Sequence, residues 1–195
     1  MIFDLGGVLV RIRHDWSEVA RLVGLRSEPM ALAACPLLLR YQAGDWDDGG
    51  YLAALAERHG CPSSEAQKLH QAILDGEYPG ADRFVREVRA AGWRVGCLSN
   101  TNALHWSVLR DPARFPTVAG LDLHLASHEI GANKPDPAAF AAVEEATGAS
   151  GHDIVFIDDS RPNVDAARER GWQCYHIQPA QAVADLYSVW SWINR

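Results

Sequence analysis

Three apolar segments of the chain each end in side chains that could do chemistry. Asp4 follows the run Met-Ile-Phe, Ser99 follows Val-Gly-Cys-Leu, and the pair Asp158-Asp159 follows Ile-Val-Phe-Ile. Short apolar runs bounded by glycine or polar residues are typical of buried strands. A buried carboxylate is costly unless a partner pairs with it or a metal ion binds it. The acidic residues therefore predict either structural ion pairs or a reactive site.

These residue types suit one kind of chemistry if the fold brings them together. Several carboxylates at one point repel one another unless a cation lies between them. Hard oxygen ligands suit Mg²⁺, which can share its coordination with a phosphate. Ser99 and Lys134 could bind the other phosphate oxygens. Because an aspartate can itself attack phosphorus, the set indicates metal-assisted phosphoryl transfer, which depends on positioning and charge neutralisation.

Each of these residues could also fill an ordinary structural role. The aspartates and Ser99 could cap turns or interact with a helix dipole, and Lys134 could be a solvated loop residue. Their coincidence at strand ends, and the presence of only two lysines in the chain, favour function. For Asn163, capping of the following helix is as good an interpretation as a role in the site.

From residue 79 onward the chain alternates between strand-like and helix-like segments. Alternation of this kind is typical of a parallel α/β sheet, in which ligands bind beyond the carboxyl ends of the strands. We therefore expect the polar strand ends to meet at one edge. Strands are expected at residues 94–99, 121–127, 153–157 and 173–177, and helices at 81–91, 104–109, 137–146, 163–170 and 180–193.

Residues 15–78 have a different pattern, with apolar positions at helical spacing and no good strand candidate. This predicts an all-helical insertion of about four helices after the first strand. The predicted domain organisation is an α/β core formed by residues 1–13 and 79–195, with a helical cap at residues 14–78. A chain of 195 residues suits one core with such an insertion.

The composition excludes several classes of function. A net charge of −7 gives no general attraction to nucleic acid or anionic membranes. No apolar stretch reaches transmembrane length, and no basic region precedes the first apolar run, so we expect neither a membrane anchor nor a signal peptide. The four cysteines lack CxxC spacing and are expected to be reduced. The reduced thiols and the absence of a signal peptide favour a cytoplasmic location. We expect a monomer or a homodimer.

Four short motifs, in order, resemble those of the haloacid dehalogenase superfamily of phosphohydrolases over nearly the whole chain. They are Phe-Asp-Leu-Gly-Gly-Val at residues 3–8, Leu-Ser-Asn at 98–100, Lys134-Pro135, and Asp158-Asp159 with Asn163. The resemblance implies a Rossmann-like core, and the helical insertion is similar to a type 1 cap. Residues 98–102, followed by His105-Trp106, resemble more narrowly the α-D-glucose-1-phosphate phosphatase-like proteins and the phosphatase domain of soluble epoxide hydrolase.

The resemblance also implies a role for each residue in hydrolysis through an aspartyl-phosphate. Asp4 would be the nucleophile and, with the Gly6 carbonyl and Asp159, a ligand of Mg²⁺. Asp158 would be a further ligand or would hold Lys134. The remaining residues would bind the phosphate or orient the ligands: Lys134 would tie the phosphate to Asp4, Ser99 and the Asn100 backbone would bind phosphate, and Asn163 would act from outside the metal ligands.

Gly6 departs from the family pattern, because most phosphatases of the superfamily carry an acid–base aspartate at that place. Acid–base help is typically worth ~10²–10⁴ in rate. We therefore expect slow turnover of alkyl phosphates and better turnover of substrates with good leaving groups, such as anomeric sugar phosphates. His14, His105 and His128 are candidate substitutes.

Other residues have functional and structural interpretations that the sequence leaves open. Arg11 and Arg13 could bind a substrate carboxylate or second phosphate, or be solvated. In the expected cap, Tyr41, Gln42 and Trp46 surround a Gly44 turn that could reach the site, although packing is expected for at least one of them. The tryptophans at 190 and 192 could pack against the sheet or mark a dimer interface.

Two other functions stay open as alternatives to a phosphatase. Halide displacement from 2-haloacids also uses an aspartate nucleophile but needs no metal. Against it, the expected aromatic-Gly-Thr after the nucleophile is replaced by Gly6-Gly7-Val8, and the acidic pair suits a metal. The third possibility is a phosphate-binding or scaffold protein that has lost catalysis.

Overall fold

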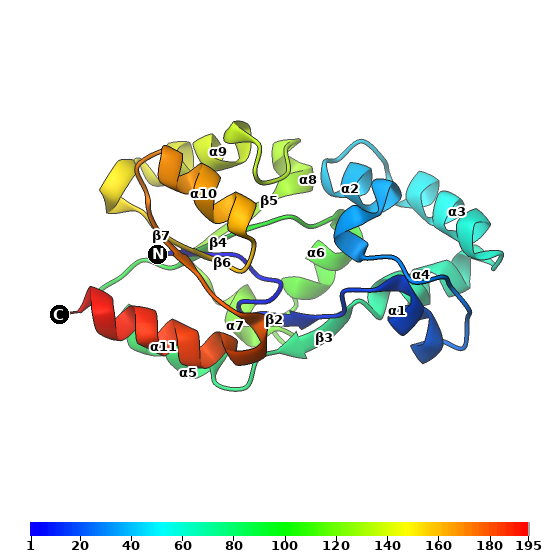
Figure 1. Cartoon of the computed structure of the whole chain (residues 1–195), viewed down its shortest axis with the longest axis horizontal. Coiled ribbons are helices and arrows are strands. Elements are labelled where there is room, and N and C mark those ends of the chain that lie inside the picture. The colour runs from blue at the N-terminus through cyan, green and yellow to red at the C-terminus, as the bar shows by residue number, and fades with distance from the viewer. Residues whose placement is uncertain (195) are drawn as a thin grey trace.

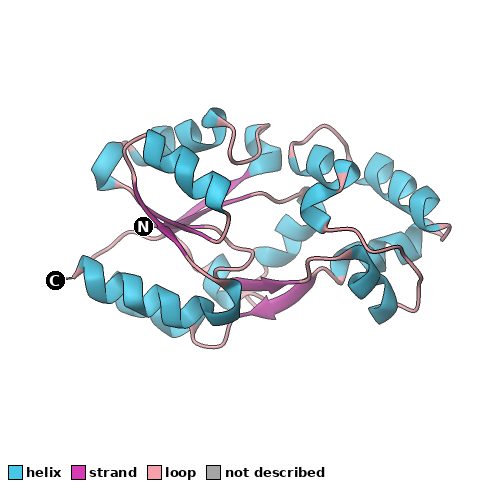
Figure 2. Cartoon of the chain, viewed as in Figure 1, coloured by secondary structure: helices cyan, strands magenta, loops and turns pink. Residues whose placement is uncertain are grey.

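The computed structural model describes residues 1–194, and a five-stranded parallel sheet lies at its centre (Figure 2). The expected parallel α/β fold is confirmed. The strand register pairs Phe3 with Cys97 and Ile157, and pairs Ser99 with Ala126. The residues that follow these strands therefore meet at one edge. In spatial order the strands are β5 (Leu123–Ala126), β4 (Gly96–Ser99), β1 (Ile2–Phe3), β6 (Val155–Asp158) and β7 (Gln173–His176).

Helices cover both faces of this sheet (Figure 1). The helices α5 (Ala81–Ala90) and α11 (Ala182–Ile193) lie on one face, and α9 (Pro137–Thr147) and α10 (Arg161–Glu169) lie on the other. Successive strand residues point to opposite faces, so Phe3 belongs to the apolar cluster under α5 while Ile2 belongs to the cluster under α9. Burial on both faces explains why the strands read as continuous apolar runs.

A second, two-stranded sheet corrects one expectation from the sequence. Strand β2 (Val10–Ile12) pairs antiparallel with β3 (Leu74–Glu77), although no strand was expected within residues 15–78. The segment Leu-Asp-Gly-Glu has little β-propensity, and its partner strand is distant in the chain. Only tertiary pairing makes β3 a strand, and the cap limits of 14–78 stay a prediction.

The residues between β2 and β3 form the expected helical insertion with its own apolar core. Trp16, Tyr41, Tyr51 and Leu69 lie in this core and are at most 1% exposed. Asp15 and Asp47 cap their helices by accepting backbone N–H groups. The insertion contains α1 (Trp16–Leu22), the 3₁₀ helix η1 (Leu32–Ala34), α2 (Pro36–Gln42), α3 (Asp48–His59) and α4 (Ser63–Gln71).

The remaining elements are short connections around the sheet. The expected helix after β4 is α6, whereas α7 and α8 are too short for apolar periodicity to show. They are α6 (Ala103–Leu109), α7 (Pro116–Ala119), α8 (Ser127–Ile130), and the 3₁₀ helices η2 (Gly151–Asp153) and η3 (Pro179–Gln181).

Surface features add to this picture. Trp190 packs edge-on against Phe84 and Trp93, whereas Trp192 is 62% exposed.

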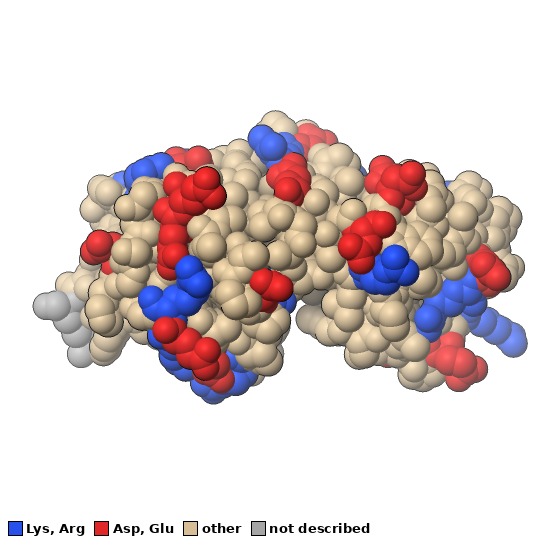
Figure 3. All heavy atoms as spheres, turned by 90° about the horizontal axis from the view of Figure 1, so that it is seen from above, with Lys and Arg blue, Asp and Glu red and all other residues tan. Residues whose placement is uncertain are grey.

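Acidic and basic side chains are intermixed on the face shown in Figure 3 rather than gathered by sign. All four cysteines are free thiols. Within residues 1–194, none of the helices has the length and apolar character needed to cross a bilayer.

Candidate active site

The Lys134 ammonium lies between two buried carboxylates at the carboxyl edge of the sheet. Its Nζ donates to Asp4 Oδ1 at 2.7 Å, to Asp158 Oδ2 at 2.8 Å and to the Leu98 carbonyl at 2.6 Å. These three bonds use all three protons of the ammonium. Asp4, Lys134 and Asp158 are 9%, 4% and 0% exposed. The amine therefore has one fixed orientation, with Asp4 on one side and Asp158 on the other.

One lysine does not balance the three carboxylates of this site. Burial raises the pKa of Asp4 to about 7, opposed by Lys134 and reinforced by Asp158 and Asp159. Burial, followed by the charge of Asp158, also raises the pKa of Asp159. Burial acts to lower the pKa of Lys134, but the two carboxylates outweigh it and raise the pKa above the ordinary value. The site thus has an excess of negative charge that an added cation would relieve.

The donor set fits a hard divalent cation. Asp4, Asp158 and Asp159 each offer a carboxylate oxygen, and these atoms lie within 4.8 Å of one another. Asp158 is already engaged, because Oδ1 accepts from the Ser160 N–H at 2.7 Å and both oxygens accept from Asn163 Nδ2 at 3.2 and 3.0 Å. Asp4 and Asp159 are therefore the freer donors.

The turn after Asp4 brings backbone close to Asp159. The Leu5 carbonyl accepts three backbone N–H groups, and Gly7 has a φ of 77° that favours glycine. A Cβ at Gly7 would lie 2.5 Å from Asp159 Oδ2, so any larger residue would displace this carboxylate. The sequence signal for this contact was the Gly-Gly pair, which reads as a simple strand break.

Asn100 locks the lysine loop onto the end of β4. Its side-chain Nδ2 donates to the Lys134 carbonyl at 2.9 Å, and its Oδ1 accepts from the Lys134 N–H at 2.7 Å. Ser99, the preceding residue, is 4% exposed and lines the same cavity as Asp4 and Lys134. Two hydrogen bonds thus join the two loops, a role of the Asn100 side chain that the sequence did not suggest.

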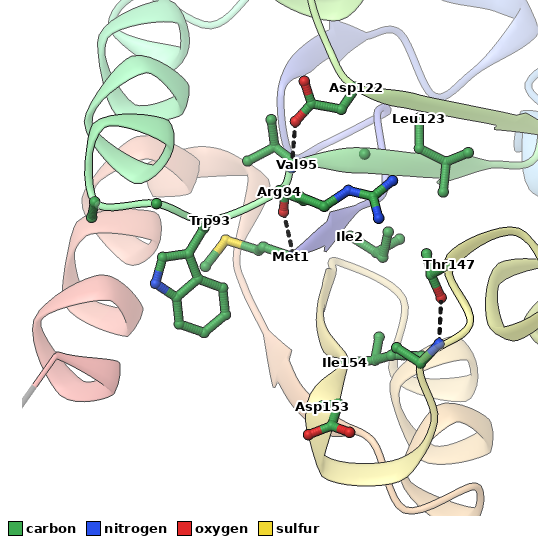
Figure 4. A pocket seen from close by; sticks show the side chains of 14 residues that line it. Met1, Ile2, Trp93, Arg94, Val95, Asp122, Leu123, Thr147, Asp153 and Ile154 are labelled. Atoms are coloured by element: carbon green, nitrogen blue, oxygen red, sulfur yellow. Dashed lines mark hydrogen bonds between the residues drawn. The ribbon is translucent and has the colours of Figure 1, made fainter.

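These residues line the floor of a cavity of about 470 Å³, within the roughly 300–1,000 Å³ typical of small-molecule sites. A second cavity, of about 330 Å³, opens at the amino ends of the strands, beside Ile2 and Val95 (Figure 4). Its Asp122 accepts from the Val95 N–H and pairs with Arg89, so that carboxylate is structurally engaged. The carboxylate cluster belongs to the larger cavity alone.

The three histidines that could replace the missing acid–base residue differ in their position relative to the cavity. His14 is exposed and lines the cavity. His105 also lines it, but Nδ1 lies 3.3 Å from Asn102 Nδ2 and Nε2 lies 2.9 Å from the His70 carbonyl oxygen, so both ring nitrogens are engaged. His128 is not among the residues lining the cavity.

The remaining candidates are mostly structural. Arg11 and Arg13 both pair with Asp75 on β3 and do not line the cavity. Tyr41 is buried in the core of the insertion and the partly buried Trp46 packs against that core, which confirms a packing role. Gln42 lines the cavity, and its Nε2 donates to the Asn100 carbonyl at 3.3 Å.

Ser127 and the buried histidines His70 and His105 join the insertion to the core, and the sequence did not reveal these contacts. Ser127 Oγ lies 2.6 Å from the Gln42 carbonyl and 3.0 Å from the Thr101 carbonyl, and it accepts from the Thr101 N–H at 2.9 Å. His70 Nε2 lies 3.0 Å from Asn102 Oδ1. Isolated serine and histidine residues carry no sequence signal for such contacts.

Comparison with known proteins identifies the type of chain. The family profile of haloacid dehalogenase-like hydrolases matches residues 1–171. The chain is 30% identical over 209 residues to Phosphatase MT3486 of Mycobacterium tuberculosis, covering 95% of this chain and 89% of that protein. It is 28% identical over 190 residues to a phosphoglycolate phosphatase of Pseudomonas putida, covering 89% and 67% respectively.

Solved structures share the fold. A haloacid dehalogenase family enzyme of Bacteroides thetaiotaomicron, solved as a magnesium complex, has a TM-score of 0.80 at 24% identity, covering 95% of this chain and 96% of that one. The L-2-haloacid dehalogenase of Xanthobacter autotrophicus has a TM-score of 0.62 at 21% identity, covering 94% and 79%.

Proposed function

This chain belongs to the haloacid dehalogenase-like hydrolases, and we propose that it is a Mg²⁺-dependent phosphohydrolase of a small phosphorylated metabolite. The observation that carries the proposal is the Lys134 ammonium, hydrogen-bonded to Asp4 and Asp158 on the floor of the cavity. The full-length similarity to a mycobacterial phosphatase supports the same reaction class. The narrower resemblance to the glucose-1-phosphate phosphatase-like branch stays a prediction.

We assign the nucleophile to Asp4. Lys134 holds Oδ1, and within residues 1–194 the other oxygen, Oδ2, accepts no hydrogen bond, which leaves its lone pairs for attack on phosphorus. Attack forms the Oδ2–P bond and breaks the bond from phosphorus to the leaving oxygen, which departs with the electron pair. A water molecule then cleaves the aspartyl-phosphate, releasing phosphate and regenerating Asp4.

The other residues position and neutralise charge. Asp4, the Gly6 carbonyl and Asp159 would hold Mg²⁺, which when bound would neutralise phosphate oxygens. Asp158 holds Lys134 rather than the metal, because its oxygens already accept four hydrogen bonds. Asn163 supplies two of these bonds and so keeps Asp158 oriented.

Ser99 and the Asn100 backbone would bind the transferring phosphate. The Asn100 side chain clamps Lys134, which leaves its backbone N–H as the group available to a ligand. Ser99 lies beside Asp4 in the lining of the cavity. Because Gly6 offers no proton, the leaving group must depart with little acid assistance, and the rate should depend on its basicity.

Turnover of an aryl phosphate with and without Mg²⁺ tests the proposal. We expect Mg²⁺-dependent release of phosphate that Asp4→Asn abolishes and that the surface variant Asp165→Asn retains. Halide release from 2-haloacids without metal would instead support a dehalogenase. Phosphate binding without turnover of any substrate would support a binding protein.

A leaving-group series tests the role of Gly6. Aryl phosphates should be hydrolysed faster than alkyl phosphates of similar size and polarity, because a phenol leaves more readily than an alkyl alcohol. Equal rates across the series would contradict the view that acid assistance is missing.

A further inference from the structure

We propose that the alcohol part of the substrate is apolar, rather than a polyol or a carboxylic acid. The inference rests on the proposed phosphatase function and defines its substrate class. The floor of the cavity is polar, but the wall that the insertion and β2 place over it is aliphatic. That wall contains Ile12, Leu32, Leu38, Leu39, Ile73 and Leu74.

Leu39 is the member of this wall that lacks a protein partner over much of its surface. It is 38% exposed, and within residues 1–194 the other exposed large apolar residues are Leu22 at 58% and Trp192 at 62%. The other two do not line this cavity. An exposed aliphatic side chain above a phosphate site gains free energy when an apolar ligand covers it.

The wall is held at a fixed distance from the phosphate site. Asn133 Nδ2, next to Lys134, donates to the Leu39 carbonyl at 2.9 Å, and Ser127 Oγ lies 2.6 Å from the Gln42 carbonyl. Gln42, at the end of α2, also donates through Nε2 to the Asn100 carbonyl at 3.3 Å. Helix α2 is therefore attached to both loops that carry candidate phosphate ligands. An ester bound through its phosphate would place its alcohol part against this helix.

Hydroxyl groups would find few partners on this wall. The insertion contributes one amide to the cavity, Gln42, and one of its two Nε2 protons is already donated to the Asn100 carbonyl. His14 is a further polar side chain of the cavity and is exposed to solvent. Burying hydroxyl groups without hydrogen-bond partners costs free energy, so a sugar would bind less well than a ring of the same shape without hydroxyls.

A second anionic group would also lack a counter-charge. Lys134 has all three protons engaged, and Arg11 and Arg13 are turned away to Asp75. Two histidines also line the cavity: His14, which is exposed, and His105, whose two ring nitrogens are already engaged by Asn102 and the His70 carbonyl. The geometry therefore disfavours phosphorylated carboxylic acids as well as sugars.

Two pairs of esters of matched shape test this inference. Hydrolysis of cyclohexylmethyl phosphate and of glucose 6-phosphate releases in each case a primary alcohol attached to a six-membered ring. Isobutyl phosphate is nearly isosteric with phosphoglycolate. We expect kcat/KM to be at least about tenfold higher for the apolar member of each pair, the size of effect that pocket contacts of this kind produce. Equal values, or a preference for the polar member, would overturn the inference.

A substitution in the wall tests whether these residues cause the preference for apolar esters. Leu39→Asn should lower the ratio of kcat/KM for cyclohexylmethyl phosphate over glucose 6-phosphate, whereas Leu22→Asn, an exposed leucine outside the cavity, should leave the ratio unchanged. An unchanged ratio in Leu39→Asn would contradict the assignment of the wall.

Binding separates failure of this inference from failure of the proposed function. The phosphonate analogues of the first pair, in which CH₂ replaces the ester oxygen, can be titrated calorimetrically in the presence of Mg²⁺ without turnover. Tighter binding of the cyclohexyl analogue by about tenfold or more supports the inference even if no ester is hydrolysed. Equal binding overturns it even if aryl phosphates are hydrolysed.

Discussion

His70 on α4 stacks face to face with His105 on α6, with ring centroids 3.9 Å apart and ring planes 9° apart. The stack crosses from the insertion to the core. Tyr51 Oη lies 2.9 Å from His70 Nδ1, and Asn102 lies within hydrogen-bond distance of both rings. His70 is 0% and His105 5% exposed. Two positive charges do not fit this stack, so both rings are expected to be neutral when the insertion is docked.

Acid should destabilise the protein through this pair. Burial lowers the pKa of His105 from 6.5 to about 4, and burial together with His105 lowers the pKa of His70 well below 6.5. The unfolded chain therefore binds more protons than the folded chain between these values. The stability contributed by the neutral pair is fully present well above pH 6.5 and is lost as the pH falls toward 4, and His105 alone accounts for on the order of 2 kcal/mol of this loss at pH 5.

Urea unfolding at pH 7 and pH 5 measures this effect. Between pH 7 and pH 5 protonation of Asp4 acts in the opposite direction, because its pKa is raised in the folded chain. Replacing His105 with glutamine should therefore make the change in stability from pH 7 to pH 5 less unfavourable than in the wild type, although the variant is less stable overall. His152→Gln, at an exposed position, should keep the wild-type dependence. The same change in stability from pH 7 to pH 5 in His105→Gln and in the wild type would contradict the role of this histidine pair.

Gly6→Asp should raise the turnover of alkyl phosphates. The Gly6 backbone lies outside the left-handed region, and a Cβ there would meet Ile12 Cδ1 at 2.9 Å, the end of a flexible side chain. The carboxyl group can therefore be accommodated, and general acid–base help is worth about 10²-fold or more. Steady-state rates on an alkyl phosphate measure the gain.

Gly6→Asn is the matched control for this change. It adds the same volume without a transferable proton, and its rate should stay at or below that of the wild type. If Asp and Asn raise the rate equally, the effect is one of packing and not of proton transfer.

Mg²⁺ should raise the melting temperature, because its ligands come together only in the folded chain. A ligand at a hundred times its Kd stabilises a folded protein by about 2.7 kcal/mol. Asp159→Asn should remove the shift, whereas Asp153→Asn, an exposed acid at the opposite edge of the sheet, should retain it. Equal shifts in both variants would place the metal elsewhere. Differential scanning fluorimetry with and without EDTA is sufficient.

Lys134→Gln should impair both stability and activity. Removing one partner of a buried ion pair typically costs about 3–5 kcal/mol, and here the change leaves Asp4 and Asp158 facing each other. Mg²⁺ should recover part of the lost stability by supplying positive charge. Lys68→Gln changes the other lysine of the chain, at an exposed position, and should leave both properties intact. Loss of activity in both variants would count against a specific role for Lys134.

The α/β class and the positions of the acidic residues were readable from the sequence for a physical reason. Strands buried on both faces read as apolar runs, so a polar residue at the end of such a run, such as Asp4 or Asp158, is conspicuous. Parallel pairing then requires the ends to share an edge. Strand β3 was missed because Leu-Asp-Gly-Glu owes its conformation to β2, a partner that local propensity does not show.

The sequence by itself determined which side chains could do chemistry and that they would converge, because local apolar patterns specify strands and a parallel sheet aligns their ends. Only the tertiary structure decided which partner each of these side chains meets and which of them face the cavity. It turned Arg11 and Arg13 toward Asp75, engaged Asp158 with Lys134 and Asn163, and placed Leu39 over the cavity. These outcomes depend on contacts between residues distant in the chain, and no local pattern encodes which of several possible partners a charged or apolar side chain will meet.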